Sequence, residues 1–244
     1  MTLLDTNTST LSGDAILIQT PSGRQLLING GPSGTRLSDA LGRRLPLSAR
    51  RLDFLVVANP VAGQVTALPR IIERFPPGSV LWAGQPDASP EALSLQQALL
   101  AADIAITPAE TGQILQLGRG AELRLLSAGE RGALFLLTWG NFRALLPVGM
   151  TFEDLEALDN GRQIGPVTAL LLADGGYAPA NPPEWIANLR PQVVLLSVAP
   201  GNREGLPSPE TLEAVQGYTL LRTDRNGFIE LSTDGEQLWV EVEK

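Results

Sequence analysis

The order of short apolar strands and amphipathic helices along the chain constrains its fold more than any other feature. Residues 14–20 and 24–28 are predicted to form a β-hairpin, and residues 52–58 form a continuous apolar run typical of a buried strand. Helices are predicted over residues 35–44, 64–75 and 89–101, with a strand over 80–83. Strand and helix therefore alternate through the first part of the chain.

A run of short β segments occupies the middle of the chain, and the second half returns to alternation. A tight Gly140-Asn141 turn joins two of these segments, which is typical of a hairpin. Later helices are predicted from Thr151, which begins a Thr-x-x-Asp capping pattern, and after Pro182 and Ser208. The remaining strands are predicted at residues 104–107, 114–117, 122–126, 133–139, 142–148, 167–172, 193–198, 218–223, 228–232 and 237–242.

This order predicts the layers of the fold. Each half of the chain is rich in strands and carries its own helices, which favours two sheets packed face to face with helices on both outer sides. We therefore expect an α/β fold in the form of a four-layer αββα sandwich. No low-complexity linker divides the chain, so a single domain over residues 1–244 is expected.

The residue types that the chain lacks restrict its chemistry. The sequence has no His and no Cys, and its only Lys is the last residue, Lys244. Without His there is no imidazole base or ligand, and without Cys there is no thiolate nucleophile or ligand. Catalysis could rest only on carboxylates, hydroxyls, Arg and backbone dipoles, and no transition-metal site of ordinary strength is expected.

Charge and hydropathy restrict the partners. The formal net charge is −8, and an acidic surface repels phosphate backbones, so weak or no nucleic-acid binding is expected. No apolar run reaches the roughly 20 residues that a bilayer span requires, and residues 1–10 lack the regions of a signal peptide. We expect a soluble domain, whose compartment the absence of Cys leaves undecided.

Several loop sequences resemble a known family. Leu3-Leu4-Asp5, the segment 13–18 and Leu27-Ile28-Asn29-Gly30-Gly31-Pro32 are similar to the opening of the metallo-β-lactamase superfamily, with residues 6–12 inserted. The segments 189–193, 201–203 and 218–227 resemble most closely the β-lactamase-like domain of DNA internalisation-related competence channel proteins. The resemblance covers nearly the whole chain and implies the αββα sandwich of the metallo-β-lactamase type.

The same resemblance indicates where metal ligands would lie. The family's His-x-Asp-x-Asp-His motif falls on residues 59–64, which supply weak amide oxygens at Asn59 and Gln64 and no side-chain ligand at Val61 and Gly63. The bridging Asp corresponds to Gly149, the His-His-Gly loop begins at Asp174, and the later His corresponds to Leu206. With Asn29, where an Asp is usual, the predicted vestigial pocket comprises Asn29, Asn59, Val61, Gly63, Gln64, Gly149, Asp174 and Leu206.

The resulting hypothesis is a catalytically inactive, metal-free domain without cofactors. It would act as a structural, interaction or sensing module whose partner the sequence leaves open. In a competence DNA-uptake system, the partner would be a membrane channel of which the domain is a part. If the domain comes from such a competence channel protein, it would be extracytoplasmic. Two alternatives stay open: a hydrolase or nuclease that uses carboxylates or a hard metal, and a module that binds nucleic acid or a nucleotide without cleaving it.

Some individual residues have a simpler interpretation than a functional one. Asp174 could hold a hard cation beside Asn59 and Gln64, but hard cations want several carboxylates, and a solvated Asp in a Gly-rich turn is favoured. Asp14 could orient ligands, although a turn or capping role is favoured. Solvated surface positions are also favoured for Arg43, Arg44, Arg50 and Arg51, which form the densest basic cluster, and for Asn202, Arg203 and Glu204.

Overall fold

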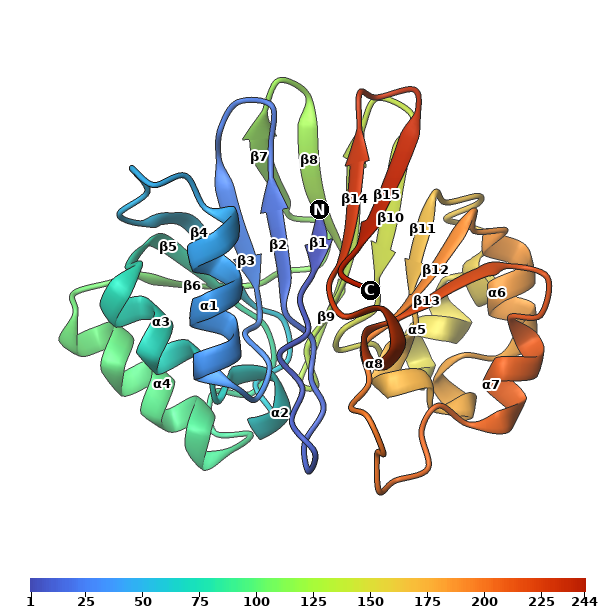
Figure 1. The fold of residues 1–244 in the computed structure, drawn as a ribbon, viewed down its shortest axis with the longest axis horizontal. Helices are drawn as coiled ribbons and strands as arrows, with labels where there is room; N and C mark the ends of the chain where they lie inside the picture. Colours follow the sequence, from blue (N-terminus) through green and yellow to red (C-terminus); the bar gives the residue numbers. More distant parts are fainter.

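Two β-sheets form the centre of the molecule in the computed structural model, which describes residues 1–244. The helices lie outside them (Figure 1), so the predicted four-layer αββα sandwich is confirmed. The first sheet contains β1 (Thr2–Leu3), β2 (Ile16–Gln19), β3 (Gln25–Ile28), β4 (Leu52–Val57), β5 (Pro77–Trp82), β6 (Ile106–Pro108), β14 (Ile229–Thr233) and β15 (Leu238–Val242). The second contains β7 (Ile114–Gly118), β8 (Ala121–Ala128), β9 (Ala133–Trp139), β10 (Phe142–Leu146), β11 (Ala169–Leu171), β12 (Val193–Leu196) and β13 (Thr219–Arg222).

Each sheet joins an antiparallel part to a parallel part. In the first sheet the order is β15-β14-β1-β2-β3-β4-β5-β6, and the strands from β3 to β6 are parallel. In the second sheet the order is β13-β12-β11-β10-β9-β8-β7, and the strands from β10 to β13 are parallel. Helical connections join most of the parallel strands, as right-handed crossovers require, so their carboxyl ends share one edge of the sandwich.

Apolar side chains from both sheets fill the space between them. Leu26 and Ile28 of β3 point into this inner core, while Leu27 points to the helical side, because side chains alternate across a strand. Phe135 and Leu146 of the second sheet meet them in the same core, and Phe135 is fully buried. The alternation explains why these strands are apolar on both faces.

The outer layers cover the other face of each sheet. The helices α1 (Gly34–Arg44), α2 (Ala62–Val65), α3 (Leu68–Arg74) and α4 (Pro90–Ala101) lie on the first sheet, with Leu37, Leu41 and Leu95 in the core they share. The helices α5 (Phe152–Ala157), α6 (Pro183–Leu189) and α7 (Pro209–Ala214) lie on the second, where Trp185 is fully buried. None of the helices is both long and apolar enough to cross a membrane.

Helix boundaries follow local sequence. Ser89 caps α4 by accepting a hydrogen bond from the Ala92 amide at 3.1 Å, and Thr151 and Asp154 form the predicted capping box of α5. The single helix predicted over residues 64–75 is wrong, because it divides into α2 and α3. Pro69 stands in the first turn of α3, where its missing N–H costs no helical hydrogen bond, so the helix restarts there.

Two further details differ from the sequence-based expectation. Thr2 and Leu3 lie outside the predicted strands but form β1, because they pair with β2 on one side and β14 on the other. The segment between the predicted strands at 218–223 and 228–232 forms one helical turn, α8 (Thr223–Asn226), which Gly227 ends with a positive φ of 67°. Three short 3-10 segments, η1 (Asp159–Gly161), η2 (Ala173–Gly176) and η3 (Ala178–Ala180), complete the chain.

The inner core should dominate the stability of the sandwich. Truncating Phe135 to Ala leaves a cavity between the sheets, so we expect a loss of about 3–5 kcal/mol in the free energy of unfolding. Leu47→Ala is the control, because Leu47 is 94% exposed and its loss should change stability by less than about 0.5 kcal/mol. Urea denaturation followed by circular dichroism measures both, and equal losses would contradict this account of the core.

Candidate functional site

A polar cavity of about 550 Å³ lies at the edge where the parallel strands end. Its lining includes Asn59 and Gln64 from the segment after β4, Asp174 after β11, and Leu206 and Glu204 from the loop after β12. Val61 also lines it. Loops far apart in the sequence therefore meet at one place, because the strands that precede them are parallel neighbours within two facing sheets.

The other three predicted residues lie directly behind the cavity wall. The side-chain amide of Asn29 donates to Gln64 Oε1 at 2.9 Å, and its Oδ1 accepts from the Ala58 amide at 2.7 Å. Gly63 lies in α2 beside Gln64, and Gly149 follows Val148, whose carbonyl oxygen accepts from Asn59 Nδ2 at 3.3 Å. All eight predicted residues are thus brought to the same edge.

Backbone occupies the space beside Gly63 and Gly149. A Cβ at Gly63 would lie 2.4 Å from the carbonyl oxygen of Ser12, and one at Gly149 would lie 2.5 Å from Cα of Gly132. Real Cβ atoms are not found so close to backbone atoms. No side chain can therefore begin at either position unless the neighbouring backbone moves.

The two amides of the cavity already have protein partners. Asn59 is 3% exposed, and besides its bond to Val148 its Oδ1 accepts from the Val61 amide at 3.3 Å. Gln64 Oε1 also accepts from the Asp14 amide at 2.8 Å, and Gln64 Nε2 donates to Asp14 Oδ2 at 3.0 Å. Each of these amides hydrogen-bonds to a second loop, so the two side chains hold the loops together.

Asp14 is part of the site, and its expected turn or capping role is wrong. Its side chain does not cap a turn but lines the cavity, and the residue is 8% exposed. Burial raises the pKa of Asp14 from 3.8 to about 7, the Gln64 hydrogen bond opposes this rise, and the negative charge of Asp174 adds to it. No Arg or Lys forms an ion pair with this carboxylate.

Arg131 is a residue of the site that sequence reasoning missed. It lies between β8 and β9, and its guanidinium forms an ion pair with Asp174 across the cavity wall. Asp174 does adopt a turn, with a φ of 48°, but it is paired and its side chain is only 28% exposed. Arg131 stands in an unremarkable Gly-Glu-Arg-Gly turn, so no local pattern in the sequence indicated it.

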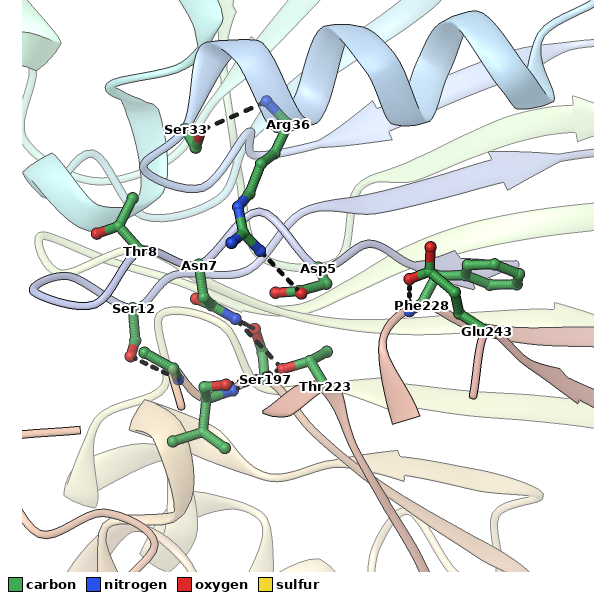
Figure 2. Close-up of polar contacts among 12 residues, drawn as sticks. Asp5, Asn7, Thr8, Ser12, Ser33, Arg36, Ser197, Thr223, Phe228 and Glu243 are labelled. Atoms are coloured by element: carbon green, nitrogen blue, oxygen red, sulfur yellow. Dashed lines mark hydrogen bonds and ion pairs between the residues drawn. The ribbon is translucent and has the colours of Figure 1, made fainter. Parts of the chain in front are cut away.

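The loop over residues 6–13 contributes Ser12 and Gly13 to the cavity lining, and Figure 2 shows its polar contacts. The buried Asn7 donates to the hydroxyl oxygens of Ser197 and Thr223, both at 3.2 Å, and accepts from the Gly13 amide at 2.8 Å. Ser12 Oγ accepts from the Ala199 amide at 3.1 Å. These bonds join the start of the chain to the ends of β12 and β13, and they hold Asp14 at the cavity.

The basic cluster lies elsewhere and is not uniformly solvated. Arg44 packs over the ring of Phe228, with 3.9 Å from Cζ to the ring centroid, and donates to the Ala40 carbonyl oxygen. Arg43, Arg50 and Arg51 are exposed, as expected. The loop residue Glu204 is also exposed but lines the cavity, and Asn202 donates to Ser12 Oγ at 3.2 Å, so this loop belongs to the site.

The donor set of the cavity does not suit a transition metal. No group of three His, Cys, Asp or Glu side chains is placed so that it could hold a metal ion. Asp174 is engaged by Arg131, Asp14 is bound to Gln64, and the remaining oxygens belong to neutral amides and hydroxyls. The arrangement can bind a polar molecule, and its carboxyl groups can exchange protons.

Comparison with known proteins identifies the fold. Zn²⁺-bound PqqB from Methylobacterium extorquens is similar, with 15% identity over 86% of this chain and 85% of that protein and a TM-score of 0.60. CmlA, a diiron β-hydroxylase from Streptomyces venezuelae, has 18% identity over 85% of this chain and a TM-score of 0.54. This chain spans only 51% of the length of CmlA. No protein-family model and no curated protein matches the sequence.

These structural neighbours share a fold of the metallo-β-lactamase type. The four-layer sandwich of this chain is accordingly of the metallo-β-lactamase type, as the resemblance in sequence implied. At such low identity the likeness concerns the fold alone, because one fold can carry many unrelated functions.

The buried carboxyl group predicts an unusual dependence of stability on pH. The pKa of Asp14 is higher in the folded than in the unfolded protein, so the folded state holds its proton more tightly. Below about pH 4 the carboxyl group is protonated in both states, so this difference in pKa does not lower the free energy of unfolding there. The cost grows as pH rises and is complete above about pH 7, where a rise of about three units corresponds to about 4 kcal/mol. Asp14→Asn should therefore be more stable than the wild type at pH 8, and the difference should vanish near pH 4.

Urea denaturation across this pH range measures the difference between the two proteins. Asp39→Asn is the matched control, because Asp39 is exposed and its side chain has no hydrogen bond or ion pair. Arg131, Asp174 and Glu204 are the other charged groups at the cavity and stay unchanged in both variants. If Asp14→Asn were less stable than the wild type at pH 8, the raised pKa would be refuted.

Proposed function

We propose that residues 1–244 form a metal-independent, catalytically inactive domain that acts as a binding or interaction module. The observation that carries this proposal is the backbone packed against Gly63 and Gly149. In the related family these two positions supply metal-binding carboxylates, and here the adjoining chain leaves no space for any side chain. These two positions, which the resemblance assigns to ligands, are packing contacts in this protein.

Electrostatics supports the same proposal. The Arg131 guanidinium lies against Asp174, the one carboxylate in a loop that the family uses for ligands. A fixed positive charge there repels a divalent cation, and it satisfies the carboxylate without any bound ion. PqqB binds Zn²⁺ and CmlA is a diiron enzyme, but neither type of site can be built from the amides and the ion pair of this cavity.

The hydroxyl groups of the cavity offer no activated nucleophile. Ser197 Oγ donates to the Gly13 carbonyl oxygen at 2.9 Å and accepts from Asn7, so no base contacts it. Nucleophilic catalysis by Ser requires an adjacent group that removes the proton. This observation favours binding over covalent hydrolysis.

A second candidate is a hydrolase that uses carboxylates. Asp14 favours it, because a buried carboxyl group with a pKa of about 7 in a cavity has the properties of a general acid or base. Such an enzyme would lose its activity in Asp14→Asn and keep it in the control Asp39→Asn. A binding module would show no turnover in any of these proteins.

The biological setting is proposed from sequence. The segments that resemble competence channel proteins favour a role in DNA uptake. The partner would then be a membrane channel of which the domain is a part. The domain would then be extracytoplasmic. Its part in such a system would be structural or ligand-sensing, in keeping with the proposed binding or interaction module.

Restoring a ligand should fail. Gly149→Asp introduces a side chain where backbone lies 2.5 Å away, so we expect a loss of about 1–3 kcal/mol in stability and no bound metal. Gly129→Asp is the matched control, because a Cβ there meets nothing within 4 Å. Elemental analysis after dialysis and urea denaturation test both variants and the wild type. About one equivalent of Zn, Mn or Fe per chain in the wild type would overturn the proposal.

DNA binding should be weak. With a net charge of −8, we expect no appreciable affinity for single- or double-stranded DNA at physiological salt, where nonspecific binders reach about 10⁻⁴ to 10⁻⁶ M. Fluorescence anisotropy would test the wild type beside Arg43→Glu/Arg50→Glu, which alters two exposed members of the basic cluster. Arg119→Glu/Arg225→Glu is the charge-matched control. Micromolar binding that only the first double variant abolishes would favour a nucleic-acid-binding module, and metal-stimulated cleavage would favour a nuclease.

A further inference from the structure

We propose that the cavity binds a small organic cation with primary amine groups, of the diamine class. This inference rests on the proposed function as a binding module and names the chemistry of its ligand. Three features of the cavity support this inference: the charge of its wall, one unpartnered carboxylate oxygen, and an exposed aromatic ring in its lining.

The cavity wall is negative. Asp14, Asp174 and Glu204 line it together with one cation, Arg131, which makes a formal charge of −2 when all four groups are ionised. Arg131 already neutralises Asp174. The carboxylates of Asp14 and Glu204 therefore remain without a cationic partner, and a ligand with two positive charges would balance them.

Asp14 provides the strongest indication of a ligand. The residue is 8% exposed, and only its Oδ2 accepts a hydrogen bond, from the neutral amide of Gln64. Its Oδ1 makes no hydrogen bond within the chain, although the side chain faces the cavity. Charged groups are seldom buried without a partner, so a cationic donor that enters the cavity would supply what the protein does not.

The rest of the lining suits an ammonium group. Tyr177 is 46% exposed and lines the cavity, and an aromatic face attracts a cation. Ser197 Oγ accepts only from Asn7, so it keeps one acceptor lone pair for a ligand on the wall held by the loop over residues 6–13. Ser12 Oγ already accepts from Ala199 and Asn202. A volume of about 550 Å³ is ample for a diamine of four carbons and lies within the range of small-molecule sites.

The same features disfavour other ligands. An anion would face two uncompensated carboxylates, and the one guanidinium available to it is engaged by Asp174. A hard metal ion would need several carboxylates at one point, whereas the carboxylates of this cavity are not grouped so that three of them could hold one ion. A diamine differs from both, because one carboxylate oxygen is enough to accept a hydrogen bond from each of its two ammonium groups.

Calorimetry with 1,4-diaminobutane tests the proposal. The uncharged 1,4-butanediol and the dianion succinate have the same chain length, and CaCl₂ and MgCl₂ test hard cations. We expect binding of the diamine alone, weakened about tenfold or more in Asp14→Asn, because a charge-assisted hydrogen bond is lost. Asp39→Asn, which removes an exposed carboxylate outside the cavity, should bind as the wild type does.

A second variant changes affinity in the opposite direction. Arg131→Gln removes the competing cation and frees Asp174, so we expect the diamine to bind more tightly, on the order of fivefold. Damage to the fold would weaken binding and could not produce this gain. Arg131 is exposed, and an exposed ion pair contributes little to stability, so the variant should fold.

The outcomes separate this inference from the proposed function. No diamine binding at millimolar concentration, equal binding of the diol or succinate, or affinity unchanged in Asp14→Asn would overturn the inference. Binding of Ca²⁺ or Mg²⁺ without the diamine would overturn it in favour of a hard-metal site. Each of these results leaves the metal-independent module standing unless the protein also contains stoichiometric transition metal or turns over a substrate.

Discussion

The buried hydrogen bonds of Asn7 are the constraint on which the cavity depends. This side chain connects the loop over residues 6–13 to Ser197 and Thr223, at the ends of two strands of the second sheet. Asn7 is fully buried, so an unmade bond there would cost far more than it would at the surface. The loop is consequently held where the Ser12 carbonyl oxygen lies against Gly63, and where Asp14 meets Gln64.

Most side chains at the loop edge of this sandwich are neutral or pair with another side chain of the protein. A metal site concentrates negative charge and depends on a cation to stabilise it. Here Arg131 offsets Asp174, while Asn59 and Gln64 hydrogen-bond to backbone and to a neighbouring side chain. The folded domain is thereby stabilised at this edge by its own side chains. The buried carboxylate of Asp14 and the exposed one of Glu204 are the exceptions, because neither has a cationic partner, and the proposed role of the cavity follows from them.

The fold that this chain shares with its structural neighbours does not by itself specify a function. PqqB shares its architecture at 15% identity, and the shared features are the two sheets and the layers of helices. These depend on apolar positions such as Leu26, Phe135 and Trp185, which pack in the same way whether or not the loops carry chemistry. The loops determine function, and in this protein backbone atoms lie against Gly63 and Gly149, two of the positions that the resemblance assigns to metal ligands.

The sequence by itself determined the layers, most helix starts and the loops that meet at the cavity, because periodicity, caps and turn residues are local signals. It also excluded imidazole and thiolate chemistry through composition alone. Only the tertiary structure decided that Arg131 pairs with Asp174, that Asp14 is buried, and that Gly63 and Gly149 have no space for side chains. The two side-chain pairs join residues 43 and 50 positions apart, Arg131 with Asp174 and Asp14 with Gln64, where no local pattern records the contact. Burial and pairing depend on which distant segments the packed sheets bring together, and that is a property of the whole fold.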